Sequence, residues 1–138
     1  MRYDLKTLLL LEDEPLVMKV LRLMLKQFSV VEATTAEKAL QAFGNRDHPV
    51  DLLITDIRLP TLSGIQVALR IRSELPAFPV LLMSGYPEGG WRSADAIDLE
   101  KLGTDSVVLL QKPFQAKALL SAVYDLIGKP YVDIARTA

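Results

Sequence analysis

Five short apolar runs recur along the chain, and segments with helical periodicity separate them. In these intervening segments, apolar residues recur every three or four positions, which is typical of amphipathic helices. Strands that alternate with helices are typical of a parallel sheet whose crossover connections are helical. The pattern therefore predicts an α/β fold. The apolar runs cover residues 7–11, 28–32, 50–55, 80–83 and 107–111.

The helical segments cover about 16–27, 36–43, 65–75, 93–102 and 115–128. In the second of them, the Thr34 hydroxyl is predicted to cap the helix by accepting a hydrogen bond from the amide of Glu37. The simplest architecture is a (βα)₅ doubly wound parallel sheet of the flavodoxin-like kind, and 2-1-3-4-5 is the strand order that known folds of this kind adopt. We expect one domain over residues 5–128 and a C-terminal tail over residues 129–138.

The first helical segment is apolar on almost every side. Lys19, Arg22 and Lys26 recur at helical spacing and form one narrow polar stripe. Met18 and Leu23 are predicted to lie toward the outer side of this helix. Two interpretations are open: the helix is deeply packed, or it forms part of a docking surface.

Polar residues stand at the ends of four of the apolar runs. Glu12 and Asp13 follow the first run, Asp56 follows the third, Ser84 follows the fourth and Lys112 follows the fifth. In a parallel sheet these residues emerge at one edge, outside the carboxyl ends of the strands, where open α/β sheets bind their ligands. Three converging acids repel one another unless a cation neutralises them. Oxygen ligands of this kind suit Mg²⁺, so we expect a magnesium site here.

The composition narrows the functional classes. The chain has 138 residues, of which 16 are basic and 17 acidic, with a formal charge of −1. This balance provides no basic face for nucleic acid. There is no cysteine, and no apolar stretch approaches the roughly 18 residues of a membrane span. We therefore expect a soluble, cytoplasmic domain that neither binds nucleic acid nor inserts into membranes.

Asp56 has the surroundings that a phosphoryl acceptor needs. A carboxylate can attack phosphorus to give an acyl phosphate, and the transfer depends chiefly on positioning and on neutralising charge. Glu12 and Asp13 can hold a metal ion on one side of the incoming group. Lys112 can pair with a phosphoryl oxygen, and Ser84 can donate a hydrogen bond to another. Before phosphorylation, Lys112 is expected to pair with Asp56 itself.

Four short motifs give the chain a resemblance to a known family. The sequence resembles the receiver domain of two-component response regulators over about residues 5–128. Its motif sequences are most similar to those of receivers of hybrid histidine kinases. The motifs are Leu-Leu-Glu-Asp-Glu at 10–14, Asp-Ile-Arg-Leu-Pro at 56–60 with Gly64, Met-Ser-Gly-Tyr at 83–86, and Gln-Lys-Pro-Phe at 111–114. The peptide bond between Lys112 and Pro113 is a candidate for the cis form.

The resemblance implies a role for each site residue. Asp56 would accept a phosphoryl group from the phosphohistidine of a histidine kinase or histidine phosphotransfer protein. Asp13, Asp56 and the backbone carbonyl of Arg58 would bind Mg²⁺, with Glu12 helping directly or through water. Ser84 and Lys112 would sense the phosphoryl group. Such a domain is a signalling phosphoacceptor in a phosphorelay rather than an enzyme with a separate substrate: it catalyses only its own phosphorylation and dephosphorylation, and homodimers are compatible with it.

The chain departs from the family pattern in two places. Family members usually carry an aromatic residue three positions before the lysine, as a ring that swings inward on phosphorylation, and here that position is Leu109. Tyr86 and Trp91 are aromatic candidates to replace it. The stretch between Ser84 and Lys112 is also several residues longer than in compact receivers.

Three alternative functions fit the sequence less well than a receiver. Aspartyl-phosphate phosphatases of the haloacid dehalogenase type place Asp-x-Asp after the first strand, whereas residues 12–14 read Glu-Asp-Glu and no cap segment is present. A receiver-like module kept only for protein interaction predicts loss of Asp56, Lys112 or the acidic pair, and all are retained. A flavin-binding loop after the first strand would be rich in Ser, Thr and Gly rather than in acids.

Overall fold

The computed structural model describes residues 6–85 and 92–129. The predicted C-terminal tail over 129–138 therefore falls almost wholly outside the described residues, as do Tyr86 and Trp91. Among the described helices, none is both long enough and apolar enough to cross a membrane.

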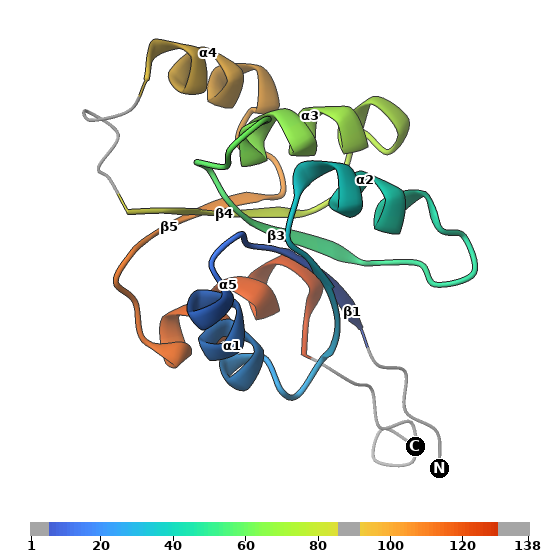
Figure 1. The fold of residues 1–138 in the computed structure, drawn as a ribbon, viewed down its shortest axis with the longest axis vertical. Coiled ribbons are helices and arrows are strands. Elements are labelled where there is room, and N and C mark those ends of the chain that lie inside the picture. Colours follow the sequence, from blue (N-terminus) through green and yellow to red (C-terminus); the bar gives the residue numbers. More distant parts are fainter. Residues whose placement is uncertain (1–5, 86–91, 130–138) are drawn as a thin grey trace.

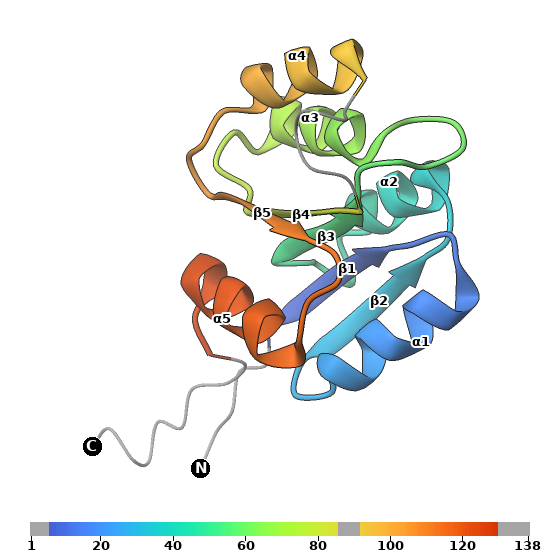
Figure 2. The same ribbon diagram turned by 90° about the vertical axis from the view of Figure 1, so that its left-hand side faces the viewer.

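All five predicted strands are present in one parallel sheet, and the predicted order β2-β1-β3-β4-β5 is confirmed. The strand arrows run in the same direction through the middle of the molecule, so all the carboxyl ends lie along one edge (Figure 2). The strands are β1 (Thr7–Leu11), β2 (Ser29–Ala33), β3 (Leu52–Asp56), β4 (Val80–Ser84) and β5 (Val107–Gln111).

Helices cover both faces of the sheet. Figure 1 shows α1 and α5 on one face and α2, α3 and α4 on the other. In both views α4 lies beyond α3, farther from the sheet than its neighbours (Figures 1 and 2). The helices are α1 (Pro15–Met24), α2 (Ala36–Gly44), α3 (Gly64–Glu74), α4 (Ser93–Leu102) and α5 (Ala116–Ile127).

The central strands are buried on both faces, which explains their continuous apolar sequence. Alternate residues of a strand point to opposite faces. Leu9 and Leu11 accordingly belong to the core under α2 and α3, while Leu8 and Leu10 belong to the core under α1 and α5; all four are fully buried. This packing fixes the register of β1 against its neighbours, because a slip by one residue would exchange the two cores.

The caps of α2 and α3 differ from the prediction. The cap of α2 is Thr35 rather than Thr34, because the helix begins at Ala36 and the Thr35 hydroxyl accepts from the backbone N–H of Lys38 at 3.1 Å. The predicted cap at Thr34 is therefore wrong by one residue. A complete capping box instead starts α3, where the side chains of Ser63 and Gln66 each accept from the other's backbone N–H.

The first helix is only partly as predicted. It ends at Met24, three residues earlier than expected. Met18 is buried rather than on the outer side, whereas Leu23 is exposed as predicted. Three apolar side chains stand in solvent on one side of the helix: Leu16 is 79% exposed, Val20 49% and Leu23 65%. The helix therefore has an apolar exposed row in addition to its basic residues.

The start of α3 packs directly against the end of β3. The N–H of Gly64 donates to the carbonyl of Ile57 at 2.8 Å. A methyl group added at Gly64 would overlap the backbone carbonyl oxygen of Asp56 and the side chain of Thr55. Only glycine allows this close approach of helix and strand.

Gly64→Ala is therefore expected to lower the free energy of unfolding by about 1–3 kcal/mol, as overpacked substitutions do. Gly44→Ala is the matched control, because nothing lies within 4 Å of a side-chain carbon at that helical position. Urea denaturation of both variants measures the effect. Equal stability of Gly64→Ala and the wild type would show that the helix start moves away from β3 without cost.

Candidate functional site

The strand register brings the predicted site residues together. Leu11 of β1 pairs with Thr55 of β3, so the next residues along these two strands, Glu12 and Asp56, are neighbours. Carboxylate oxygens of Glu12, Asp13 and Asp56 lie within 4.8 Å of one another. The sequence-based prediction that these three acids converge is confirmed.

Strands β4 and β5 place the remaining two residues at the same edge. Ser84 pairs with Gln111, the residue before Lys112, and the backbone N–H of Lys112 donates to the Ser84 carbonyl at 2.7 Å. The Lys112 ammonium donates to Oδ2 of Asp56 at 3.1 Å. The expected Lys112–Asp56 pair is thus present, and the peptide bond from Lys112 to Pro113 is cis.

Glu12 is the most unusual ionisable group of the site. Its side chain is buried, and neither carboxylate oxygen has a hydrogen-bond partner among the described residues. Burial, followed by the negative charge of Asp56, raises the pKa of Glu12 to about 7. Unpartnered buried carboxylate oxygens are costly unless a proton or a cation satisfies them.

The pKa of Asp56, which is partly buried, is subject to two opposing effects. Loss of solvent raises its pKa above the ordinary value, while the charge and hydrogen bond of Lys112 lower it. Its side chain is 17% exposed and that of Lys112 is 27% exposed. A carboxylate that is partly exposed and paired with one cation can meet an incoming phosphoryl group.

The residues present fit a bound divalent cation. Three carboxylates provide hard oxygen ligands at suitable separation, and the orphaned oxygens of Glu12 need a positive partner. The hollow beside them has a volume of about 270 Å³ and is lined by Asp13, Glu14, Asp56, Arg58, Ser84, Gly85 and Lys112. Arg58 therefore borders the site, while ligation by its backbone carbonyl stays a prediction.

Two residues that line this hollow, Glu14 and Gly85, were not predicted from the sequence to belong to the site. Both directly follow a predicted site residue, Asp13 and Ser84, and that adjacency was the available signal. Leu109, in place of the usual aromatic, is partly buried and packs against the core on the α3 side of the sheet.

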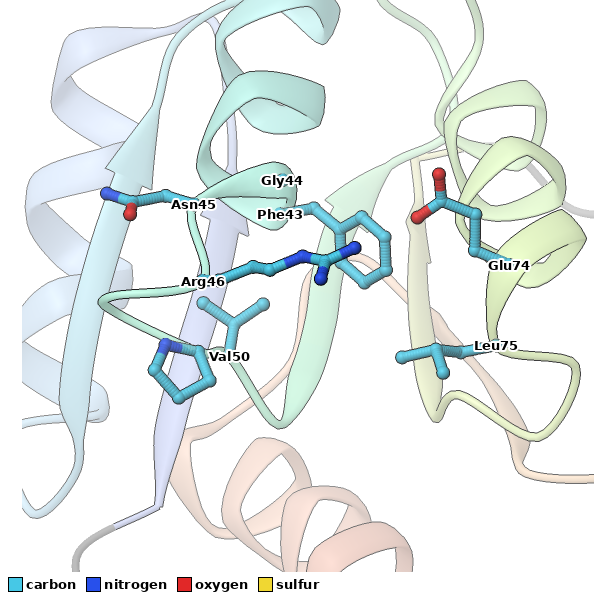
Figure 3. A pocket seen from close by; sticks show the side chains of 8 residues that line it. Phe43, Gly44, Asn45, Arg46, Val50, Glu74 and Leu75 are labelled. Atoms are coloured by element: carbon cyan, nitrogen blue, oxygen red, sulfur yellow. The ribbon is translucent and has the colours of Figure 1, made fainter.

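A larger hollow of about 710 Å³ lies at the opposite end of the sheet, where α2 and α3 end. In Figure 3 the Arg46 side chain extends in front of the Phe43 ring. Glu74, the last residue of α3, and Leu75, which directly follows the helix, stand across from it. This hollow is far from the converging acids and holds a single carboxylate, so its chemistry does not resemble that of the acidic site. Size alone does not locate the functional site here.

Comparison with known families agrees with the geometry. The profile of the response regulator receiver domain matches residues 8–124, which is most of the chain. The chain belongs to the receiver domain family of response regulators. Receiver domains are the phosphoacceptor modules of two-component systems, and the acidic pocket of the family binds Mg²⁺.

Curated relatives and solved structures support the same assignment. The response regulator GtcR of Aneurinibacillus migulanus is 33% identical over 79% of this chain and 42% of its own length. The two-component response regulator PhoP of Pseudomonas aeruginosa is 35% identical over 88% of this chain and 52% of its own length. This receiver thus spans about half the length of these relatives.

Among solved structures, a response regulator receiver domain protein from Clostridium thermocellum superposes with a TM-score of 0.76. It is 26% identical, and the match covers 89% of this chain and 94% of that protein. A response regulator receiver protein from Pseudomonas putida gives a TM-score of 0.72 at 28% identity, over 88% of this chain and 98% of the other. The receiver fold predicted from the sequence is thereby confirmed.

The raised pKa of Glu12 predicts how the stability of the metal-free receiver depends on pH. A carboxyl group with a higher pKa when folded than when unfolded binds more protons in the folded state, so stability falls as pH rises from about 4.5 to about 7. Glu12→Gln should remove about 1–3 kcal/mol of this loss. Urea denaturation in chelator at pH 5 and pH 8 tests it, with Glu37→Gln, on the exposed side of α2, as the control. An unchanged slope in Glu12→Gln would contradict the predicted protonation.

Proposed function

We propose that Asp56 is the phosphoacceptor of this receiver and that it takes its phosphoryl group from a partner phosphohistidine with the help of Mg²⁺. The observation that carries the proposal is the convergence of three acids and Lys112 at one edge of the sheet. The matched family fits this reaction class.

In the proposed transfer, a carboxylate oxygen of Asp56 attacks the phosphorus of the phosphohistidine. The new O–P bond forms as the N–P bond of the partner's imidazole breaks, and the imidazole leaves with the electron pair and takes up a proton. The product is an acyl phosphate on Asp56. Such a transfer is accelerated mainly by positioning and by neutralisation of the phosphoryl charge.

The surrounding residues supply that positioning and charge. Asp13 and Asp56 would hold Mg²⁺, with Glu12 beside them, and the ion would neutralise phosphoryl oxygens. The Lys112 ammonium already lies 3.1 Å from Asp56 and can pair with a further phosphoryl oxygen. The Ser84 hydroxyl can donate to another. The proposed activity is confined to phosphorylation and dephosphorylation of the receiver itself, without a separate substrate.

The proposed partner surface includes the exposed side of α1. This helix begins at Pro15, two residues after Asp13, so it borders the acidic site. Its exposed apolar row is flanked by the basic residues Lys19 and Lys26. We propose that the helix carrying the phosphohistidine packs its own apolar side on this row, with acidic residues facing the lysines. Large exposed apolar side chains in one row are typical of such a protein interface.

Phosphorylation of Asp56 predicts a simple labelling result. Acetyl phosphate and Mg²⁺ should add one phosphoryl group to the wild-type receiver, detected as a single mass increase that is lost in base. Asp56→Asn should not be labelled, because the amide is not a nucleophile, and excess chelator should abolish labelling of the wild type. Glu37→Gln, remote from the site, is the control. Equal labelling of Asp56→Asn, or labelling undiminished by chelator, would contradict the proposal.

If the partner docks on α1, a substitution in this helix should slow phosphoryl transfer from a kinase domain but not from the small donor acetyl phosphate. Leu23→Glu should slow transfer from a phosphorylated kinase domain that labels the wild type by about tenfold or more, because interface anchors contribute at least 1–2 kcal/mol. Labelling by acetyl phosphate should be unchanged, because Leu23 lies two helical turns beyond the site. Leu75→Glu is the matched control, at an apolar position that is 50% exposed at the other end of the molecule. Equal transfer rates for both variants would exclude this docking surface.

A further inference from the structure

Arg72, in the last turn of α3, donates hydrogen bonds to four backbone carbonyls. Its Nε donates to Phe78 at 2.9 Å and its Nη1 to Leu102 at 3.2 Å. Its Nη2 donates to Asp105 at 2.7 Å and to Ser106 at 3.1 Å. One side chain therefore links three segments that are up to 34 residues away in the sequence.

The four acceptors lie close to the starts of β4 and β5 and to the end of α4. Phe78 stands two residues before β4, and Ser106 stands directly before β5. The Ser106 carbonyl also accepts from the backbone N–H of Val80, the first residue of β4, at 2.9 Å. Leu102 is the last residue of α4, where helix carbonyls have no partner within the helix. Arg72 thus holds the starts of two strands and the end of one helix at a single point.

Backbone conformation around these acceptors explains how they converge. Gly103 and Ser106 both have positive φ angles, 81° and 55°, so the chain turns sharply between α4 and β5. The turn directs three carbonyls toward α3. A guanidinium matches this arrangement because its donors spread in a fixed plane, whereas a lysine ammonium is a single point.

The two ends of α4 differ in how firmly they are held. Its C-terminal end is bonded to Arg72 and buries Leu102 in the core. Its N-cap, Arg92, has no side-chain capping bond within the described part of the chain. The helix lies on α3 rather than on the sheet (Figures 1 and 2). Ser84 and Lys112 stand at the opposite ends of the same strands, β4 and β5, whose starts Arg72 holds.

We propose that Arg72 is a conformational anchor, which keeps the C-terminal end of α4 and the starts of β4 and β5 fixed in both phosphorylation states, so that α4 responds only through its N-terminal half. The claim that these segments stay fixed in both phosphorylation states rests on the proposed phosphorylation of Asp56. The anchoring by Arg72 does not depend on it and can be tested in the unphosphorylated receiver.

The first test measures amide hydrogen exchange, resolved by residue with NMR, in the unphosphorylated receiver. In Arg72→Lys, the amides of Gly103 and Val80 should exchange about tenfold faster or more, because charge-assisted hydrogen bonds are lost. The amide of Ala96, near the start of α4, should keep its rate. Arg70→Lys is the matched control, an exposed arginine on the same helix. Equal acceleration at Ala96 and Gly103, or no acceleration at either, would overturn the anchor.

The second test adds beryllofluoride and Mg²⁺ as a phosphoryl mimic. In the wild type, exchange should change at Ala96 and stay constant at Gly103 and Val80, whereas in Arg72→Lys the change should extend to Gly103. A change at Gly103 in the wild type as large as that at Ala96 would overturn the proposal. Failure of every amide to respond would count against both the phosphoryl site and the two-state role of Arg72, while the first test still decides whether Arg72 anchors the unphosphorylated chain.

Discussion

Repulsion between carboxylates held together at the end of the sheet is the constraint on which the site depends. Parallel pairing of β1 with β3 makes Glu12 and Asp56 neighbours, and Asp13 follows at once, so three acids share a space less than 5 Å across. The Lys112 ammonium balances one of them. The remaining charge is relieved either by a proton, which the raised pKa of Glu12 favours, or by a divalent cation. Protons and metal ions therefore compete for the same acidic cluster.

Most of the fold could be predicted because each strand and helix is marked by the pattern of apolar residues within its own segment. Continuous apolar runs identify strands buried on both faces, and the intervening periodicity identifies helices on both sides of the sheet. The errors fall at helix boundaries, where two adjacent candidates compete. Thr34 and Thr35 both suit an N-cap, and tertiary packing of Ala36 selects Thr35. Met18 was misplaced because an apolar helix gives few polar residues from which to judge its inner side.

The site residues could be predicted for a similar reason, because strand ends in a parallel sheet share one edge. What could not be predicted depends on contacts between backbone segments. The sequence does not reveal that Gly64 must lack a side chain to pass the carbonyl of Asp56. Nor does it reveal that Arg72 bonds carbonyls on three separate segments, because a backbone carbonyl is present at every residue and carries no sequence signal. The full burial of Glu12 is likewise a consequence of packing by its neighbours.

The existing pair between Lys112 and Asp56 would limit how the proposed phosphorylation acts on β5. A conformational change requires a group that interacts more favourably with one state than with the other. The Lys112 ammonium lies beside Asp56 before any phosphoryl group arrives, so it distinguishes poorly between two positions of β5. Leu109 packs against the core without a ring that could occupy two places, and the start of β5 is bonded to Arg72. Ser84 is the last residue of β4, so under the proposed phosphorylation its hydroxyl would meet a phosphoryl oxygen as a new hydrogen-bond acceptor, and this would place the response on the side of α4.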